Sequence, residues 1–248
     1  MIIFTKKEFV DLLYKCLDTN NIYVNGGFGV NLSIPSQVER YTTNNEYNRE
    51  HADEIKACAE KGHGWGWDCI CLIKSLLWGF NFNEKEKYGG AKYKSNGIDD
   101  YSTSGFFKHC CYGQKWIEKT DVIPEGAILW TEGHIAVSIG NGLVIESTRY
   151  GGAKVRIAGI RGIYKGKDYP LRTFDKWGYC QFILYEDRKK GDINGDGKID
   201  ARDYALCKRI VLKTFEPDDV QRWAADINGD GKVSAMDYLR LKRMVLKK

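Results

Sequence analysis

The feature that most constrains this chain is an acidic loop that occurs twice in its last quarter. The string DINGDGKI begins at Asp192, and DINGDGKV begins 34 residues later at Asp226. Each copy carries oxygen-bearing side chains at loop positions 1, 3, 5, 9 and 12, with a glycine at position 6. A hard cation needs about six to eight oxygens around one point, and a short loop supplies them by alternating inward around a sharp glycine turn. The repeat therefore predicts two calcium loops of the EF-hand type.

The predicted ligands are the side chains at those five positions and the backbone carbonyl at position 7. They are Asp192, Asn194, Asp196, Lys198, Asp200 and Asp203 in the first loop, and Asp226, Asn228, Asp230, Lys232, Ser234 and Asp237 in the second. Position 12 is Asp in both loops, where Glu is usual. The apolar spacing in DYALCKRIVL and DYLRLKRMVL predicts a helix after each loop, and no helical pattern precedes either one. Each repeat is therefore expected to be a loop followed by a helix.

Two half EF-hands of this kind resemble a type I dockerin, the module that attaches secreted enzymes to cohesins of a cellulosome scaffold. The resemblance covers residues 191–248 and implies a small all-α domain, two Ca²⁺ ions and a cohesin partner. It places the cohesin contacts at loop positions 10 and 11 and at basic helix residues, here Ala201, Arg202, Lys208, Arg209, Ala235, Met236, Lys242 and Arg243. The common Ser-Thr pair is missing, which predicts a cohesin of a different specificity group. Solvated helix ends are the alternative interpretation of the Lys-Arg pairs.

Composition excludes several classes of protein. A hydrophobic content of 43% with only 4 prolines in 248 residues indicates a folded chain, and no apolar run reaches the roughly 20 residues that span a bilayer. The net charge of +5 is too mild to indicate nucleic-acid binding. The opening MIIFTKKEFV has too short an apolar stretch for a signal peptide. The protein is expected to be extracellular, with an export signal removed or lying outside this chain.

One of the eight cysteines is predicted to be a nucleophile. Most are expected to be reduced and buried, because this length and spacing do not fit a small disulfide scaffold. In GWGWDCICLIKSLLWGF, helical apolar spacing begins just after Asp68, so Cys69 is expected at the start of a buried helix with Asp68 as its cap. Free N–H groups and the helix dipole favour a thiolate there. Cys71 lies off the apolar face of this helix, beside Lys74 and Ser75, and therefore ranks below Cys69 as a nucleophile. For Cys69 itself, the alternative interpretation is a buried core cysteine.

A thiolate nucleophile needs an imidazole, and His134 opens a predicted hairpin, HIAVSIGNGLVIEST. If residues 140–142 form a three-residue loop, Ile139 pairs with Leu143, and Glu146 lies diagonally beside His134. A two-residue Asn-Gly turn would move Glu146 to the other face. The apolar pattern of the second strand favours the first register. Cys69, His134 and Glu146 are therefore predicted to form a Cys-His-acceptor triad.

These elements resemble the NlpC-type family of papain-like cell-wall cysteine peptidases, especially gut-bacterial and phage-like lysin domains. The matching strings are DCICLIKSLLWG, YGGAKYKSNG, EGAILWTEGHIAVSIGNGLVIEST and YVNGGFG, within residues 1–187. The resemblance implies an α+β papain-like fold, with the Cys69 helix packed on an antiparallel sheet that carries His134. It also implies cleavage of amide bonds in peptidoglycan stem peptides, with Cys69 as nucleophile, His134 as general base and Glu146 as orienting acceptor. Some lysins of this type act instead on the amide between glycan and peptide.

The predicted organisation is a cysteine peptidase or amidase domain at 1–187, a linker at 188–190 and a dockerin at 191–248. Catalysis is expected to need no cofactor. A protein-directed cysteine peptidase and a non-catalytic wall-binding protein are the alternatives. The exact bond, the cohesin and the origin of the target wall are left open.

Other candidate residues are less specific. His109, Cys110 and Cys111 are too close in sequence to share one tetrahedral zinc ion easily. His63 could line the cleft near Cys69. Tyr23, Trp65 and Trp67 could shape a substrate groove, with ordinary packing as the alternative.

Overall fold

The structure, a computed structural model, describes residues 1–186 and 188–246 and divides the chain into two compact units. The larger unit spans residues 6–181, and the smaller one contains residues 1–5 and 182–248. This division differs from the predicted boundary at residue 187. The strand β1 (Phe4–Thr5) pairs in parallel with β12 (Ile183–Leu184), so that both ends of the first predicted domain belong to the smaller unit.

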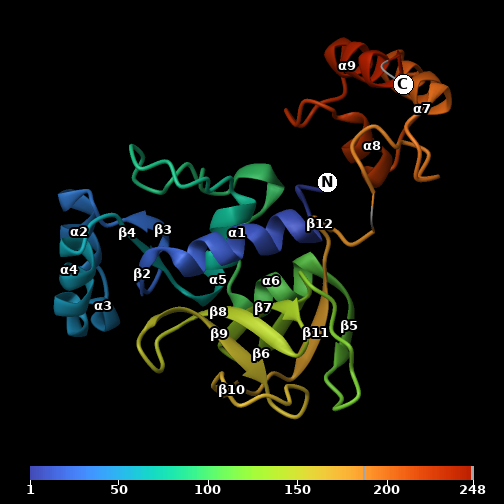
Figure 1. The fold of residues 1–248 in the computed structure, drawn as a ribbon. Coiled ribbons are helices and arrows are strands. Elements are labelled where there is room, and N and C mark those ends of the chain that lie inside the picture. Colours follow the sequence, from blue (N-terminus) through green and yellow to red (C-terminus); the bar gives the residue numbers. More distant parts are fainter. Residues whose placement is uncertain (187, 247–248) are drawn as a thin grey trace. The chain divides into compact units, whose positions relative to one another are not determined.

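The larger unit has an α+β fold around a curled seven-stranded sheet (Figure 1). Across the sheet the strands are β10 (Leu171–Arg172), β9 (Lys154–Ile160), β8 (Leu143–Thr148), β7 (His134–Gly140), β6 (Ile128–Thr131), β11 (Lys176–Cys180) and β5 (Cys111–Trp116). All neighbours are antiparallel except β10 and β9.

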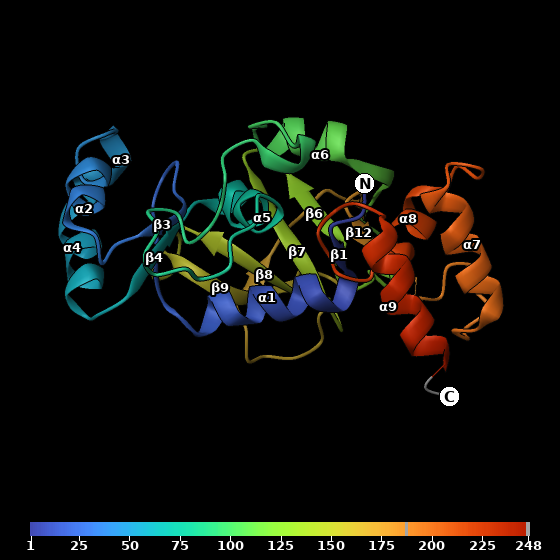
Figure 2. The same cartoon turned by 90° about the horizontal axis from the view of Figure 1, so that it is seen from above.

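Three helices pack against this sheet. The helix α1 (Lys6–Asp18) contacts β8 and β9, α5 (Cys69–Leu77) contacts β7 and β8, and α6 (Thr103–Cys110) contacts β5 and β6 (Figures 1 and 2). Alternation along the strands gives the sheet two apolar faces. Leu129, Ala136 and Val144 belong to one buried cluster, while Val137 and Ile145, which pair with each other, point the other way. The strands therefore hold the sheet between two apolar layers.

A second sheet of three strands leads into α5. Its order is β2-β4-β3, formed by β2 (Asn20–Tyr23), β4 (Gly64–Trp67) and β3 (Phe28–Asn31). Beside it lie α2 (Pro35–Tyr41), α3 (Glu46–Glu50) and α4 (Ala52–Glu60). The 3₁₀ turn η1 (Ser95–Gly97) instead contacts the end of α5, where Ser95 and Asn96 donate to the carbonyl oxygens of Trp78 and Leu77. Trp65 and Trp67 of β4 are 3% and 0% exposed, so ordinary packing is the correct interpretation of both side chains.

The hairpin of β7 and β8 corrects one prediction and confirms another. Gly140 pairs with Leu143, so Asn141 and Gly142 form a two-residue turn in which both have positive φ, and the expected three-residue loop is wrong. A bulge between Ser138 and Gly140 takes up the extra residue, and Val137 still pairs with Ile145. The predicted register beyond the bulge is therefore confirmed, and Glu146 stays on the His134 face.

The smaller unit contains α7 (Ala201–Val211), α8 (Asp219–Ala225) and α9 (Ala235–Leu246). The helices α7 and α9 follow the two loops as predicted and contact each other, with Tyr204 stacked on Tyr238 at 4.4 Å between ring centroids. These tyrosines occupy equivalent repeat positions. None of the helices in the described residues is both long enough and apolar enough to cross a membrane.

The helix α8 contradicts the prediction that no helix precedes either loop. It begins at a capping box between Asp218 and Gln221 and ends where the second loop starts. With seven residues it is too short to show a full apolar period, and its burial rests on Trp223, Ala224 and Ala225. The second repeat is thus helix, loop and helix.

Candidate functional site

The local structure places Cys69 where the sequence predicts it, at the first position of α5. The Asp68 side chain caps the helix by accepting the Cys71 N–H at 2.6 Å, and it also accepts the Gly26 N–H at 3.0 Å. Beyond the helix, Gly79 adopts φ +93°, which suits a glycine after a helix end. The N–H groups of Cys69 and Ile70, at the first two positions, have no acceptor within the helix and lie by the Cys69 thiol.

The start of α5 is tied to the strand that carries Glu146. Ser147 Oγ donates to the carbonyl oxygen of Trp67, two residues before Cys69, at 2.8 Å. Cys69 and His134 consequently line one cavity of about 280 Å³, together with Tyr23, Thr131, Glu132, Gly133, Thr148, Arg149, Tyr150 and Arg172. Two residues that lie 65 positions apart in the chain thus border the same space.

Glu146 holds the imidazole of His134 through a short contact. His134 Nε2 lies 2.6 Å from Glu146 Oε2, and the Glu146 side chain is 0% exposed. The pKa of the Glu146 carboxyl is lowered because hydrogen bonding and charge from His134, Arg172 and Arg156 outweigh its burial. An ionised carboxylate can only accept, so a neutral His134 carries its proton on Nε2 and leaves Nδ1 free as a base.

Two arginines complete this cluster and were not predicted. Arg156 Nε donates to Glu146 Oε1 at 3.0 Å, and Arg172 Nε donates to Glu146 Oε2 at 3.2 Å. Arg156 stands directly opposite Glu146 in the β8–β9 register. Strand alternation in KVRIAGI could have suggested that pairing, whereas Arg172 comes from the separate short strand β10 and has no local signal.

The resting state of Cys69 differs from the predicted thiolate. The pKa of the Cys69 thiol is raised to about 12, first by burial and then by the neighbouring Asp68 carboxylate, against smaller opposing effects of the Ile70 and Cys69 N–H groups and of Arg149. Loss of solvation and the negative charge of Asp68 thus raise the pKa of this thiol more than the N–H groups at the helix terminus lower it. The thiol needs a base before it can act as a nucleophile, and His134 borders the same cavity.

The other cysteines are less suited to such a role. All eight are free thiols; Cys69 is partly exposed and the other seven are buried. Burial and the Asp68 carboxylate raise the pKa of Cys71 well above its ordinary value. The structure is therefore consistent with ranking Cys69 above Cys71.

The remaining histidines lie outside this cavity. His63 Nδ1 is 2.8 Å from Ser33 Oγ, and its Nε2 is 3.3 Å from Glu84. The ring of His109 stacks on Tyr101 at 5.3 Å. Of the aromatic candidates, only Tyr23 borders the Cys69 cavity.

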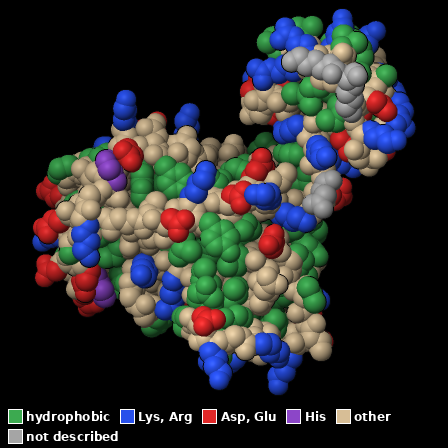
Figure 3. Space-filling model, viewed as in Figure 1, with side chains coloured by type: hydrophobic (Ala, Val, Ile, Leu, Met, Phe, Trp, Pro, Cys, Tyr) green, Lys and Arg blue, Asp and Glu red, His purple; other side chains and the backbone are tan. Residues whose placement is uncertain are grey.

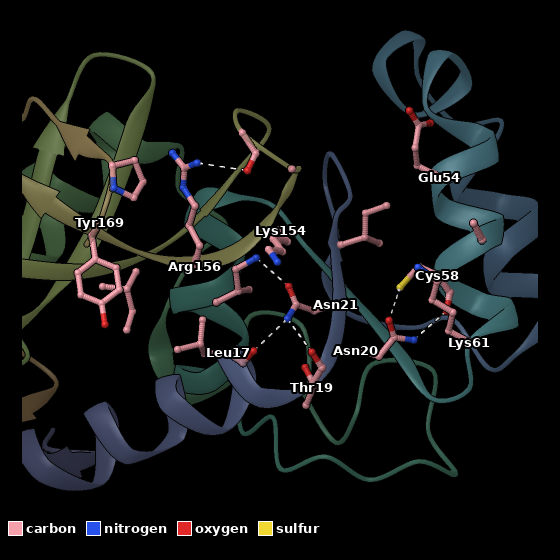
Figure 4. A pocket seen from close by; sticks show the side chains of 17 residues that line it. Leu17, Thr19, Asn20, Asn21, Glu54, Cys58, Lys61, Lys154, Arg156 and Tyr169 are labelled. Atoms are coloured by element: carbon pink, nitrogen blue, oxygen red, sulfur yellow. Dashed lines mark hydrogen bonds between the residues drawn. The ribbon is translucent and has the colours of Figure 1, made fainter. Parts of the chain in front are cut away.

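Another cavity, of about 810 Å³, is shown in Figure 4. Asn20, Asn21, Cys58 and Arg156 are among its lining residues, whereas Cys69 and His134 are not. Figure 4 shows Asn21 joined by hydrogen bonds to neighbouring backbone groups, including the Val155 N–H at 2.7 Å. Asn21 thus joins β2 to β9, the strand that carries Arg156.

The two repeated loops have matching hydrogen bonds. Asp192 accepts the N–H groups of Gly195 and Gly197, and Asp226 accepts those of Gly229 and Gly231, at 2.9 to 3.0 Å. At position 12, Asp203 accepts from Ile193, Asn194 and Asp200, and Asp237 accepts from Asn228 and Ser234. These bonds fold each loop around its own buried carboxylates.

The donor chemistry of the loops fits calcium. All predicted ligands offer oxygen, and a carboxylate has about four acceptor sites, so the N–H bonds leave capacity for a cation. Within residues 1–186 and 188–246, no set of three or more His, Cys, Asp or Glu side chains is arranged to hold a metal ion. The first loop has its own counter-charge, because Arg202 Nη2 lies 2.5 Å from Asp196 and 2.8 Å from Asp200.

The residues that the resemblance assigns to cohesin binding all lie on the surface. Ala201, Arg202, Lys208, Arg209, Ala235, Met236, Lys242 and Arg243 are exposed. Figure 3 shows many Lys and Arg side chains on the visible face of the smaller unit.

Comparison with known families decides the nature of the C-terminal repeat. Residues 190–246 match the type I dockerin domain. The chain carries a type I dockerin. No curated protein matches this chain. The dockerin implies a cohesin partner and a protein of the extracellular cellulosome, and type I dockerins generally bind calcium.

Proposed function

We propose that residues 6–181 form a papain-like cysteine amide hydrolase of the NlpC type, which the dockerin attaches to a scaffold cohesin. The observation that carries this proposal is the shared cavity of Cys69 and His134, with Glu146 Oε2 at 2.6 Å from the imidazole. A nucleophile, a base and an orienting acceptor are the three parts that such catalysis needs. The proposed substrate is the stem peptide of peptidoglycan.

The mechanism follows from the protonation states. His134 Nδ1 takes the proton of the Cys69 thiol as Sγ attacks the amide carbonyl, because the resting thiol is protonated at neutral pH. His134 then gives this proton to the leaving amine, which leaves a thioester on Cys69. Water, deprotonated by the same imidazole, hydrolyses the thioester and frees the thiol.

Two further groups support these steps. The N–H of Cys69, at the first position of α5, can donate to the developing oxyanion. Glu146 stabilises the imidazolium that forms after the first proton transfer, and Arg156 and Arg172 keep this carboxylate ionised and fixed. No metal takes part in this sequence of steps.

Digestion of purified peptidoglycan by the full-length protein tests the proposal. We expect Cys69→Ser and His134→Ala each to reduce the release of new amino groups by several orders of magnitude. Cys110→Ala is the control, because Cys110 is a buried cysteine outside the Cys69 cavity, and it should keep the activity of the folded fraction. A Cys69→Ser protein with near-normal release would refute the assigned nucleophile.

The same assay separates the alternatives. Casein cleaved in preference to peptidoglycan would indicate a protein-directed peptidase. Inertness toward both substrates, with a Cys69 that iodoacetamide does not label, would indicate a non-catalytic binding protein.

A further inference from the structure

A further cavity borders α5 and is lined by six aromatic side chains. Its volume is about 680 Å³. The residues that line it come from three parts of the chain: the segment 26–44, the segment 68–78, which contains α5, and the segment 88–102. Its aromatic members are Phe28, Tyr41, Trp78, Tyr88, Tyr93 and Tyr101.

These rings form a connected wall. Phe28 stacks on Tyr88 with 4.0 Å between centroids, and Trp78 meets Tyr93 edge to face at 5.2 Å. Phe28 also contacts Trp78 at 5.7 Å. Trp78 is buried, whereas the Tyr93 side chain is 55% exposed. The buried Trp78 ring therefore supports an outer ring, Tyr93, that solvent or a ligand can reach.

Polar groups are fixed at the edges of this wall. The Tyr93 hydroxyl donates to Asp100 Oδ2 at 2.8 Å, and Asp100 also pairs with the Lys74 ammonium group. Lys74 is 2% exposed and donates to the Tyr101 carbonyl at 2.8 Å. On another side of the cavity, Arg40 Nη1 donates to the Tyr88 hydroxyl at 3.1 Å. The hydroxyls and the half-exposed carboxylate are thus held in place before any ligand arrives.

The charges of the cavity favour a neutral ligand. Two cations, Arg40 and Lys74, are matched by two carboxylates, Asp68 and Asp100, among its lining residues. A phosphate or an acidic peptide would meet those carboxylates, and a basic ligand would meet the cations. A neutral ligand with one apolar face and a hydroxylated edge fits tyrosine rings whose hydroxyl groups already take part in hydrogen bonds. A pyranose ring has this combination.

The position of the cavity relates it to Cys69. Asp68, Ile70 and Cys71 line the aromatic cavity, while Cys69 between them lines the smaller cavity with His134. The two cavities therefore meet the first turn of α5 on different sides. A ligand that reaches from one to the other must pass this turn.

We propose that the aromatic cavity binds a neutral sugar ring of the N-acetylhexosamine class, belonging to the substrate whose amide reaches Cys69. This proposal rests on the proposed function and deepens it, because it assigns a glycan-bearing substrate rather than a free peptide. Tyr93 supplies the accessible ring face, and Asp100 supplies the acceptor for sugar hydroxyl or amide groups.

Calorimetric titration of the full-length Cys69→Ala protein with the N-acetylglucosamine trimer tests the binding step without hydrolysis. We expect Tyr93→Ala to weaken binding about tenfold or more, through loss of the ring face. Tyr112→Ala is the matched control, since Tyr112 is 54% exposed against 55% for Tyr93 and lies outside both cavities. Tyr93→Phe, which keeps the ring, should bind nearly as well as the parent.

The same titration can also contradict a sugar site in this cavity. No heat of binding with the trimer, or equal binding by the Tyr93→Ala and Tyr112→Ala proteins, would overturn the sugar site. If Tyr93→Ala unfolds, Tyr93→Leu removes the aromatic ring while keeping apolar bulk, and Asp100→Asn tests the acceptor. Binding by Tyr93→Leu equal to that of the parent would overturn the role of the ring.

Hydrolysis then separates this inference from the proposed function. With active protein, we expect glycan-linked stem peptides to be cleaved with a kcat/KM about tenfold above that of free stem peptides, and Tyr93→Ala to remove this advantage through KM. Trimer binding without any hydrolysis would refute the hydrolase while supporting the sugar site. Hydrolysis of free and glycan-linked peptides at equal rates would refute the sugar site while supporting the hydrolase.

Discussion

At Glu146, three basic side chains meet one buried carboxylate. His134, Arg156 and Arg172 all lie within 3.2 Å of its oxygens, and the Glu146 side chain is 0% exposed. An acceptor that only orients an imidazole needs one hydrogen bond. The two arginines indicate that Glu146 also stabilises the sheet, by joining β8 to β9 and β10.

Replacing Glu146 with Gln should therefore affect both stability and activity. We expect a loss of roughly 2 to 3 kcal/mol in the free energy of unfolding, less than for a fully buried pair because Arg156 and Arg172 keep partial exposure. Urea unfolding at neutral pH measures this loss, with the exposed Glu118→Gln as control. Equal stability of the two variants would contradict the structural role of Glu146.

The pH dependence of this stability has a definite sign. The folded pKa of Glu146 is lowered from its ordinary value near 4.5, so the folded state binds its proton less readily than the unfolded state. Its contribution is fully present above about pH 4.5 and is lost as the pH falls through the folded pKa. Wild type and Glu146→Gln should consequently converge in stability on acidification, which urea titrations from pH 7 to pH 3 can check.

In α5, the residue that caps the helix, Asp68, also affects the reactivity of the first helical residue, Cys69. The Asp68 carboxylate raises the pKa of Cys69 while it caps the helix. We expect Asp68→Asn to keep the cap bond, to lower the pKa of Cys69 and to speed its alkylation by iodoacetamide several-fold between pH 7 and 9. Asp68→Ala, which also loses the cap, should alkylate faster as well but should unfold at least about 1 kcal/mol more easily.

Peptide mapping of the alkylated protein identifies the labelled thiol. Slower labelling of Cys69 in Asp68→Asn than in wild type would contradict the electrostatic effect of Asp68. Labelling of wild type that stays constant from pH 6 to 9 would contradict a protonated resting thiol.

Sequence patterns predicted those features that short-range chemistry determines. The two loops and the helices after them follow from the spacing of oxygen-bearing and apolar residues, and the cap of α5 follows from Asp68 before an apolar run. The contact of His134 with Glu146 follows from strand alternation, although a two-residue turn and a bulge produce the register that a three-residue loop was expected to give. The helix α8 was missed because seven residues are too few to show a period.

The features that the sequence did not predict depend on contacts between segments that lie far apart in the chain. Arg172 reaches Glu146 from 26 positions away, and Tyr93 meets Trp78 across a loop. No pattern in a single sequence encodes such contacts. The pKa of the Cys69 thiol is raised mainly because the folded protein buries its side chain. The position of Cys69 at a helix terminus did not indicate this burial.

At the scale of the whole molecule, the two units should respond differently to calcium. Asp192, Asp203, Asp226 and Asp237 are buried carboxylates in a small unit, and like charges at short range oppose its folding unless a cation binds. We expect EDTA to unfold the dockerin and abolish cohesin binding, while hydrolysis by residues 6–181 continues. Asp192→Ala combined with Asp226→Ala should reproduce the effect of the chelator.

Circular dichroism of the full-length protein during calcium titration measures this response. The calcium-dependent helix signal should be absent in the double variant. A helix content independent of calcium would contradict metal-coupled folding of the dockerin. Hydrolysis that stops with EDTA would instead indicate a metal in the larger unit.

The most direct test of the central claim is the mass spectrum of muropeptides after purified peptidoglycan is treated with the full-length protein. The Cys69-His134-Glu146 assignment predicts products in which one amide bond has gained water, giving a new amine and a new carboxylate, and none of these with Cys69→Ala. The accurate masses also identify the bond that is cleaved. Muropeptides that stay intact, or that are broken equally by wild type and Cys69→Ala, would contradict a cysteine amide hydrolase carried by this dockerin.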